Sequence, residues 1–369
     1  MLKRILALIR KEFLSIWKDP RSRMLIVAPP LMQLLIFAHA ATMEIRNIDM
    51  AVLDRSQTLQ SRDLISEFQH SKWFRNIILV DNEKQIDQMI RSKKIQLALS
   101  INTDFAKKLK RNQPTNIQVI LDGRQTNTAS IANGYIASIV AQYEAEHFPQ
   151  RLKSTPQINL EIRNWFNPNL IFLWYTVISL ITILATTIAL VLTSLSIARE
   201  REMGTFDQLI VSPLSAFEIL VGKIVPPLMI SLIMTTLMSL FVIIFFKVPF
   251  TGSIPLFYIS MITYLLSILG VGLFFSSVCK TQQQAILGAF TFQMPAILLS
   301  GYISPVEDMP MFFQHLTLIN PVRFFLVIMK GLFLKDMPAE YVFQNLIPLV
   351  CIAILSLSAA SWMFKRNLD

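Results

Sequence analysis

Side chains that could perform chemistry are few and scattered. The four histidines are His39, His70, His147 and His315, and none lies at the spacing of metal ligands. The sequence also lacks His-Glu-x-x-His and Gly-x-Ser-x-Gly, the patterns that supply a metal-activated water or a nucleophilic serine. We therefore predict that this chain is not an enzyme and holds neither a metal nor a cofactor.

A phosphate-binding loop is also absent. Such a loop needs Gly, four residues and then Gly-Lys-Ser or Gly-Lys-Thr, so that backbone amides surround the phosphates. Gly222 and Lys223 are followed by Ile224, and Phe217 stands where the first glycine is required. If ATP drives this protein, we expect the nucleotide to bind a different subunit.

The segment 199–223 has the features of a docking site. Phe206 and Leu209 lie on one face of a short predicted helix, and Ser215 and Glu218 have the spacing of a capping box that opens a second helix. A short helix with apolar anchors and mixed charges suits a groove on a partner. The same pattern also fits a plain amphipathic connector on a membrane surface, and the segment alone does not separate these two interpretations.

The elements around this segment are membrane spans. Of the 369 residues, 53% are hydrophobic and only 16% are charged, whereas soluble chains are about 25% charged. A span needs about 20 apolar residues. Six runs meet this length, the first with one histidine and the others with no Asp, Glu, Lys, Arg or His: 24–43, 170–198, 224–246, 256–278, 281–303 and 346–364.

Basic residues predict the orientation. If the N-terminus is cytoplasmic, the short cytoplasmic connections hold thirteen Lys and Arg, and the short connections on the other side hold four. Both termini are then cytoplasmic. The net charge of +10 comes partly from seven basic residues before position 24, where lipid headgroups would meet them, so we do not expect nucleic-acid binding.

Between the first two spans, residues 44–169 read as an extracytoplasmic α/β domain. Short β-prone runs alternate with amphipathic helices, and Ile131, Tyr135, Ile139 and Tyr143 form one stripe. The strand order stays open. Strands are expected at 48–54, 77–80, 95–101, 117–122 and 158–165, and helices between the first strand and about residue 70, and at 83–91, 103–111 and 125–147.

Two further segments are expected at the membrane surface. Residues 1–23 contain an amphipathic helix with a narrow apolar arc, typical of a helix in the interface plane. Residues 304–345 contain an apolar run that is too short to cross and is broken by Pro305, Pro310 and Pro321. We predict short interfacial helices there, capping the extracytoplasmic mouth of a five-helix region, 170–369.

The spans hold almost nothing that titrates. Ion-coupled transport needs ionisable groups inside the membrane, and His39 is the only candidate in the six runs. This disfavours an ion-coupled secondary transporter without excluding it. A membrane-anchored ligand sensor is a second alternative.

The segment 199–223 resembles the connection after the second span in permeases of the type-2 ATP-binding-cassette (ABC) transporters. The resemblance continues through Asn167-Pro168-Asn169, the Leu299-Ser300-Gly301 turn and Asn320-Pro321. Within this family, the chain is similar to the multidrug-type exporter branch with a large extracytoplasmic domain. The matching residues of the segment are Glu202, Gly204, Thr205, Leu209, Pro213, Phe217, Glu218 and Lys223.

This resemblance implies a permease in the bacterial inner membrane, paired with a second permease copy or paralogue. Two cytoplasmic ATPase subunits, carrying ATP and Mg²⁺, would drive efflux by alternating access, and a periplasmic adaptor and outer-membrane channel would contact 44–169. The predicted ATPase-coupling residues are Glu200, Glu202, Gly204, Thr205, Phe206, Leu209, Pro213, Phe217 and Glu218.

Candidates for the substrate pathway are polar or aromatic residues within otherwise aliphatic spans, as a cavity for amphipathic compounds requires. They are Gln33, Trp174, Tyr175, Phe290, Phe292 and Gln293.

Overall fold

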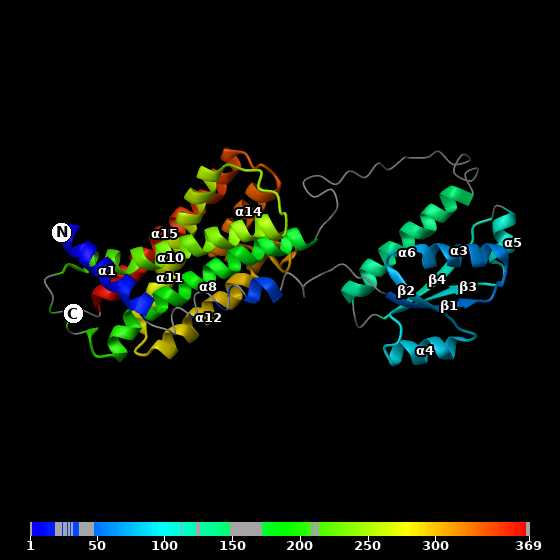
Figure 1. Cartoon of the computed structure of the whole chain (residues 1–369), viewed down its shortest axis with the longest axis horizontal. Helices are drawn as coiled ribbons and strands as arrows, with labels where there is room; N and C mark the ends of the chain where they lie inside the picture. The colour runs from blue at the N-terminus through cyan, green and yellow to red at the C-terminus, as the bar shows by residue number, and fades with distance from the viewer. Residues whose placement is uncertain are drawn as a thin grey trace. The chain divides into compact units, whose positions relative to one another are not determined.

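The computed structural model describes residues 2–18, 24, 28, 30, 32–36, 48–111, 113–122, 126–147, 172–206, 208, 211 and 214–366. The chain divides into two compact units (Figure 1). A helical unit comprises Met1–Ala41 and Asn164–Asp369, and an α/β unit comprises Thr42–Arg163.

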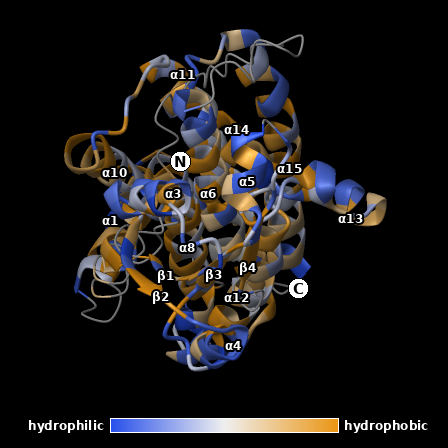
Figure 2. Ribbon diagram, turned by 90° about the vertical axis from the view of Figure 1, so that its right-hand side faces the viewer, coloured by the Kyte–Doolittle hydropathy of each residue, from blue (hydrophilic) through white to orange (hydrophobic). Residues whose placement is uncertain are grey.

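The helical unit contains long apolar helices, which appear as orange ribbons in Figure 2. In the part of the chain that the structure describes, four helices are long and apolar enough to cross a membrane, or five if one bent pair is counted. The four are α8 (Phe172–Glu202), α10 (Ala216–Phe245), α11 (Ile254–Val278) and α15 (Ala339–Arg366).

The predicted count of six spans is therefore not confirmed. The run 281–303 corresponds to α12 (Gln282–Leu298), whose 17 residues rise only about 25 Å against a hydrocarbon core of about 30 Å. The run 24–43, with His39, lies partly outside the described residues. The first helix of the unit, α1 (Leu2–Lys18), has the length expected of the amphipathic helix.

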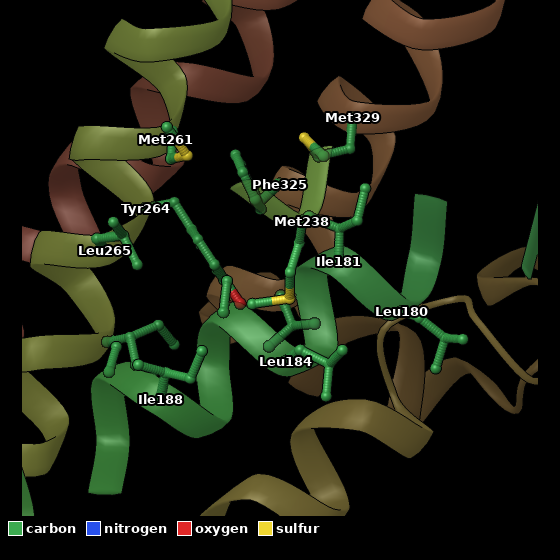
Figure 3. Close-up of a cluster of buried hydrophobic side chains, with 14 of the residues drawn as sticks. Leu180, Ile181, Leu184, Ile188, Met238, Met261, Tyr264, Leu265, Phe325 and Met329 are labelled. Atoms are coloured by element: carbon green, nitrogen blue, oxygen red, sulfur yellow. The ribbon is translucent and has the colours of Figure 1, made fainter. Parts of the chain in front are cut away.

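Helix α8 lies at the centre of the unit and is buried along most of its length. Figure 3 shows its Leu180, Ile181, Leu184 and Ile188 facing side chains from α10, α11 and α14 (Pro321–Leu334). Tyr264 of α11 stacks on Phe325 of α14 with ring centroids 4.1 Å apart, and its hydroxyl is hydrogen-bonded to Thr186 of α8. The hydroxyl of Tyr264 thus has its hydrogen-bond partner on a neighbouring helix.

Short helices fill the region 304–345, and one of them is buried. A 3₁₀ turn (Val306–Asp308), α13 (Met311–Leu316) and a second 3₁₀ turn (Thr317–Ile319) precede α14. The chain bends by 84° where α14 begins. Asn320 caps α14 by accepting from Val322 N at 3.1 Å, and its amide donates to Ala296 O at 2.7 Å. Helix α14 then packs into the bundle rather than lying flat, because both of its sides are apolar.

The α/β unit is a four-stranded sheet in the order β2-β1-β3-β4. Strand β1 is parallel to β2 and β3, and β4 is antiparallel to β3. Helices α3, α5 and α6 cover one face, and α4 covers the other. The strands are Ile48–Asp54, Phe74–Leu79, Leu97–Ile101 and Ile117–Leu121, and the helices are α3 (Leu59–His70), α4 (Glu83–Arg91), α5 (Phe105–Lys110) and α6 (Thr126–His147).

The expected elements of this unit are confirmed for the residues described, with shifts at their ends. Strand β2 begins at Phe74, three positions before the predicted start, because it pairs with β1 from Ile48 onward. The stripe on α6 is rotated by one residue, since Ala132 and Ile136 are buried with Ile139 and Tyr143. The expected strand 158–165 and the Asn167-Pro168-Asn169 step lie outside the described residues.

Candidate functional site

The predicted coupling segment begins with the end of α8. Gly204 has a φ of +69°, the left-handed conformation that glycine adopts without strain. Gly204 N donates to Arg201 O at 3.1 Å and Thr205 N donates to Glu200 O at 2.9 Å, which is the Schellman pattern of helix termination. The Gly-Thr pair therefore stops α8 four residues beyond the predicted end of the span.

The second half of the segment is the start of α10. The Ser215 hydroxyl accepts from Glu218 N at 3.3 Å, and Glu218 Oε2 accepts from Ser215 N at 2.9 Å. The predicted capping box is confirmed. The helix that it opens continues through Pro226 and Pro227 to Phe245, so this part of the segment is continuous in sequence with a membrane helix.

Three of the predicted coupling residues contact other parts of this chain. The Phe206 ring is buried between the Arg201 guanidinium, 4.7 Å from its centroid, and the edge of Phe364 in the last turns of α15. Glu202 Oε2 accepts from the backbone N of Gln282 at 2.8 Å, which ties the segment to the start of α12. Glu200 is buried as well. Phe206 and Glu200 therefore position the segment rather than form its outer surface, whereas Glu202 is exposed and still ties the segment to α12.

Other side chains of the segment are exposed. Gly204, Thr205 and Phe217 lie at the surface, which a contact with a partner would require. Met203 and Val211 are 66% and 85% exposed, and sequence reasoning did not select them. Leu209 and Pro213 lie outside the described residues.

An ion cluster with three buried members, Glu12, Glu200 and Lys223, joins the two helices that flank this segment to α1. Lys223 of α10 is 0% exposed, and its Nζ lies 3.1 Å from Glu12 Oε1 of α1 and 3.0 Å from Glu200 Oε2 of α8. Lys11 Nζ donates to Glu200 Oε1 at 2.8 Å. Two lysines and two glutamates from three helices thus form one network, which we call the α1–α8–α10 ion cluster.

The electrostatics favour the charged form of Lys11. Partial burial disfavours the charge on Lys11, but the hydrogen bond and the negative charge of Glu200 outweigh burial and raise the pKa of Lys11 above its ordinary value. An unpaired charge buried among apolar helices would cost several kcal/mol. Because Lys223 neutralises carboxylates on two other helices, loss of the lysine alone would leave buried charges unpaired and weaken the contact between α1, α8 and α10.

Sequence reasoning missed this cluster. Lys223 was placed just before a span, and Glu12 lies off the apolar arc by which α1 was recognised. The structure buries Leu8, Glu12 and Ile16 of α1 against the bundle and leaves Leu2 and Trp17 exposed. One signal was available: a lysine that follows Gly222 and is flanked by apolar residues must be paired with a carboxylate if that helix is buried.

The predicted pathway residues do not form one site. Tyr175 lies at the start of α8, where its hydroxyl donates to Tyr302 O at 2.9 Å and the Lys330 ammonium lies 3.7 Å from its ring centroid. Gln293 of α12 is buried and donates to Thr187 of α8. The others are distributed differently: Trp174 and Phe292 pack at the edge of the core, Gln33 is half-buried, and Phe290 is exposed.

No group of three His, Cys, Asp or Glu side chains that could hold a metal ion occurs among the described residues.

Comparison with known proteins gives consistent matches along the chain. The family model described as ABC-2 family transporter protein matches residues 22–362. A protein of Escherichia coli strain K12 described as "Probable multidrug ABC transporter permease YbhR" is 42% identical over 370 residues, covering 100% of both chains. "Probable multidrug ABC transporter permease YbhS" of the same organism is 29% identical over 373 residues, covering 100% of this chain and 98% of its own. "Inner membrane transport permease YhhJ" is 28% identical over 322 residues, covering 86% of this chain and 85% of its own.

Proposed function

The chain belongs to the ABC-2 family of transporter proteins and is a membrane permease of an ABC transporter, and on this premise we propose that it exports amphipathic compounds with energy from ATPase subunits on separate chains. ATP and Mg²⁺ bind those subunits, and this chain hydrolyses nothing. Its relatives named as multidrug permeases support efflux as the direction of transport.

The α1–α8–α10 ion cluster is the observation that carries the coupling part of this proposal. The exposed residues Met203 and Val211 lie on a segment whose two ends are α8 and α10. Because Lys223 binds Glu200 on α8 and Glu12 on α1, a displacement of the segment is transmitted to all three helices. ATPase closure against this surface would tilt α8, the central helix, and so alternate access to the pathway.

The proposed setting is the bacterial inner membrane, with both termini cytoplasmic. The printed name of one relative supports an inner-membrane location, and the distribution of Lys and Arg supports the orientation. A second permease copy or paralogue completes the pathway. The α/β unit would then lie outside the cytoplasm, where a periplasmic adaptor and an outer-membrane channel can reach it. Removing residues 44–169 should abolish adaptor assembly and spare ATPase binding.

The decisive experiment is transport by the complex. Vesicles containing the permease and its ATPase, encoded beside it or purified with it, should accumulate a fluorescent amphipathic probe on addition of ATP and Mg²⁺. Met203→Glu should uncouple ATPase binding from a permease that remains folded. Met311→Glu is the matched control, because Met311 is 74% exposed and lies far along the chain from the segment. Equal co-purification of the ATPase with both variants would contradict the docking surface.

Ion-coupled transport remains the second candidate, and the structure supplies one observation in its favour. Glu12 and Glu200 are buried carboxylates beside lysines, the kind of group that a proton-coupled carrier needs. Purified chain without any ATPase, placed in vesicles with a proton gradient, separates the two. Gradient-driven movement of the probe would replace the ATP-driven proposal, and no movement supports it. A ligand sensor, by contrast, would retain no ATPase in a pull-down.

A further inference from the structure

An apolar groove lies where α10, α11 and α15 meet. Its volume is about 670 Å³, within the range of about 300–1,000 Å³ typical of ligand sites. Aliphatic side chains form most of its wall, including Leu228, Leu266 and Leu357. Ser358 and Ser361 add two small hydroxyl groups to this wall.

The charge of the groove is confined to one end. Lys365, in the last turn of α15, is the only charged residue among the described residues that line it. Trp362 lies one turn before Lys365, also lines the groove, and carries the Arg366 guanidinium 5.6 Å from its ring centroid. Tryptophan and basic residues at a helix end are typical of the level of the lipid headgroups. The groove is therefore basic at its mouth and apolar along its length.

The length of the groove matches the hydrocarbon thickness of one membrane leaflet. Its α10 wall runs from Phe217 to Leu228, which at 1.5 Å per residue is about 16 Å. Half of a hydrocarbon core is about 15 Å. Both α10 and α15 leave most of their spans unburied within the chain, so lipid can reach the groove.

We propose that this groove binds one anionic phospholipid, with an acyl chain along α10 and α15 and the phosphate at Lys365. An amphiphile with a negative head and an apolar tail fits both the single charge and its position, because basic pockets between helices at a membrane surface bind anionic headgroups. A zwitterionic lipid fits the apolar wall equally well but gains less from Lys365.

Bound lipid would act on the coupling region. Leu220, Leu273 and Ala360 line the groove and also belong to the apolar cluster that holds Phe206 and Leu8 of α1. An acyl chain in the groove would contact these three residues and so add van der Waals contacts to the cluster against which the coupling segment packs. Anionic lipid should therefore stabilise the segment, whatever the compound transported or its direction.

Trp362 provides the test, since it lines the groove. Full-length protein is placed in vesicles of phosphatidylcholine containing equal mole fractions of either brominated phosphatidylglycerol or brominated phosphatidylcholine, whose bromines quench tryptophan fluorescence. The signal of Trp362 is obtained as the difference between the wild type and Trp362→Phe. We expect phosphatidylglycerol to be preferred about fivefold, the ratio given by ~1 kcal/mol for one lysine at the surface.

Three variants test whether Lys365 and the space in the groove cause the lipid preference. Lys365→Gln should abolish the preference, Lys365→Arg should keep it, and Ser358→Phe should reduce quenching by filling the groove. Lys280→Gln is the matched control, because Lys280 is exposed and does not line the groove.

Equal quenching by both lipids in the wild type would overturn the proposal, as would a preference that survives Lys365→Gln. Absence of quenching by either lipid would also overturn it, because a second protein would then cover the groove. Quenching is read without ATP or substrate, so failure here leaves the proposed export function untouched.

Discussion

The ammonium of Lys223 lies 3.1 Å from the carboxylate of Glu12, although the two residues are 211 positions apart, and both side chains are buried. The first helix of the chain is therefore fixed to the bundle by an ion pair as well as by apolar packing. A helix that only floated in the interface plane would keep such charges in water.

Lys223→Met should destabilise the helical unit by about 3–5 kcal/mol, because it leaves buried carboxylates without their shared cation. Thermal unfolding of the purified permease, followed by size-exclusion chromatography, measures the change. Lys280→Met removes a charge at an exposed position and should leave the unfolding temperature unchanged.

The double variant Lys223→Met with Glu12→Met tests whether pairing is the cause. Replacing a buried ion pair by apolar side chains is often neutral. Stability should thus recover toward that of the wild type. A double variant no more stable than Lys223→Met alone would show that the lysine acts through something other than its charge.

Gly222→Ala should displace α1. A Cβ at position 222 would lie 2.6 Å from Leu8 Cγ, closer than atoms can pack, so Leu8 and its helix must move. Hydrogen–deuterium exchange of residues 2–18 should become faster. Gly134→Ala is the control, since a Cβ there meets no atom within 4 Å and α6 should gain about 0.5–1 kcal/mol. Unchanged exchange in α1 would contradict its packing on Gly222.

Phe206 and Met203 should respond differently to substitution, because one is buried and the other exposed. Phe206→Ala should cost about 3–5 kcal/mol in the permease alone, through lost packing against Phe364. Met203→Glu should leave the unfolding temperature unchanged and reduce ATPase co-purification. A permease carrying Phe206→Ala that unfolds like the wild type would mean that this ring is a docking contact rather than a support.

Tyr175→Phe should lower the stability of the helical unit near the start of α8. The variant loses the hydrogen bond from the hydroxyl to Tyr302 O, a loss of about 1 kcal/mol. Lys330→Arg should retain the cation–π contact with the Tyr175 ring, whereas Lys330→Met should lose it. Unfolding temperatures of the three variants, compared with the wild type, rank these contributions. Equal stability of Lys330→Arg and Lys330→Met would remove any role for the contact.

Local patterns in the sequence were sufficient for several features. The capping box at Ser215 and the bounds of β1 and α4 were predicted correctly, because capping and side-chain periodicity depend on residues a few positions apart. Four of the expected spans match long apolar helices for the same reason.

The sequence by itself determined that this chain is a helical membrane protein with an α/β unit, and it predicted a coupling segment at 199–223, because composition and periodicity are local properties. Only the tertiary structure decided which side of that segment faces inward, the strand order of the sheet and the pairing of Lys223 with Glu12 and Glu200. These depend on contacts between residues far apart in the chain. The spacing of residues within one helix does not indicate which charged residue of another helix will pack beside it.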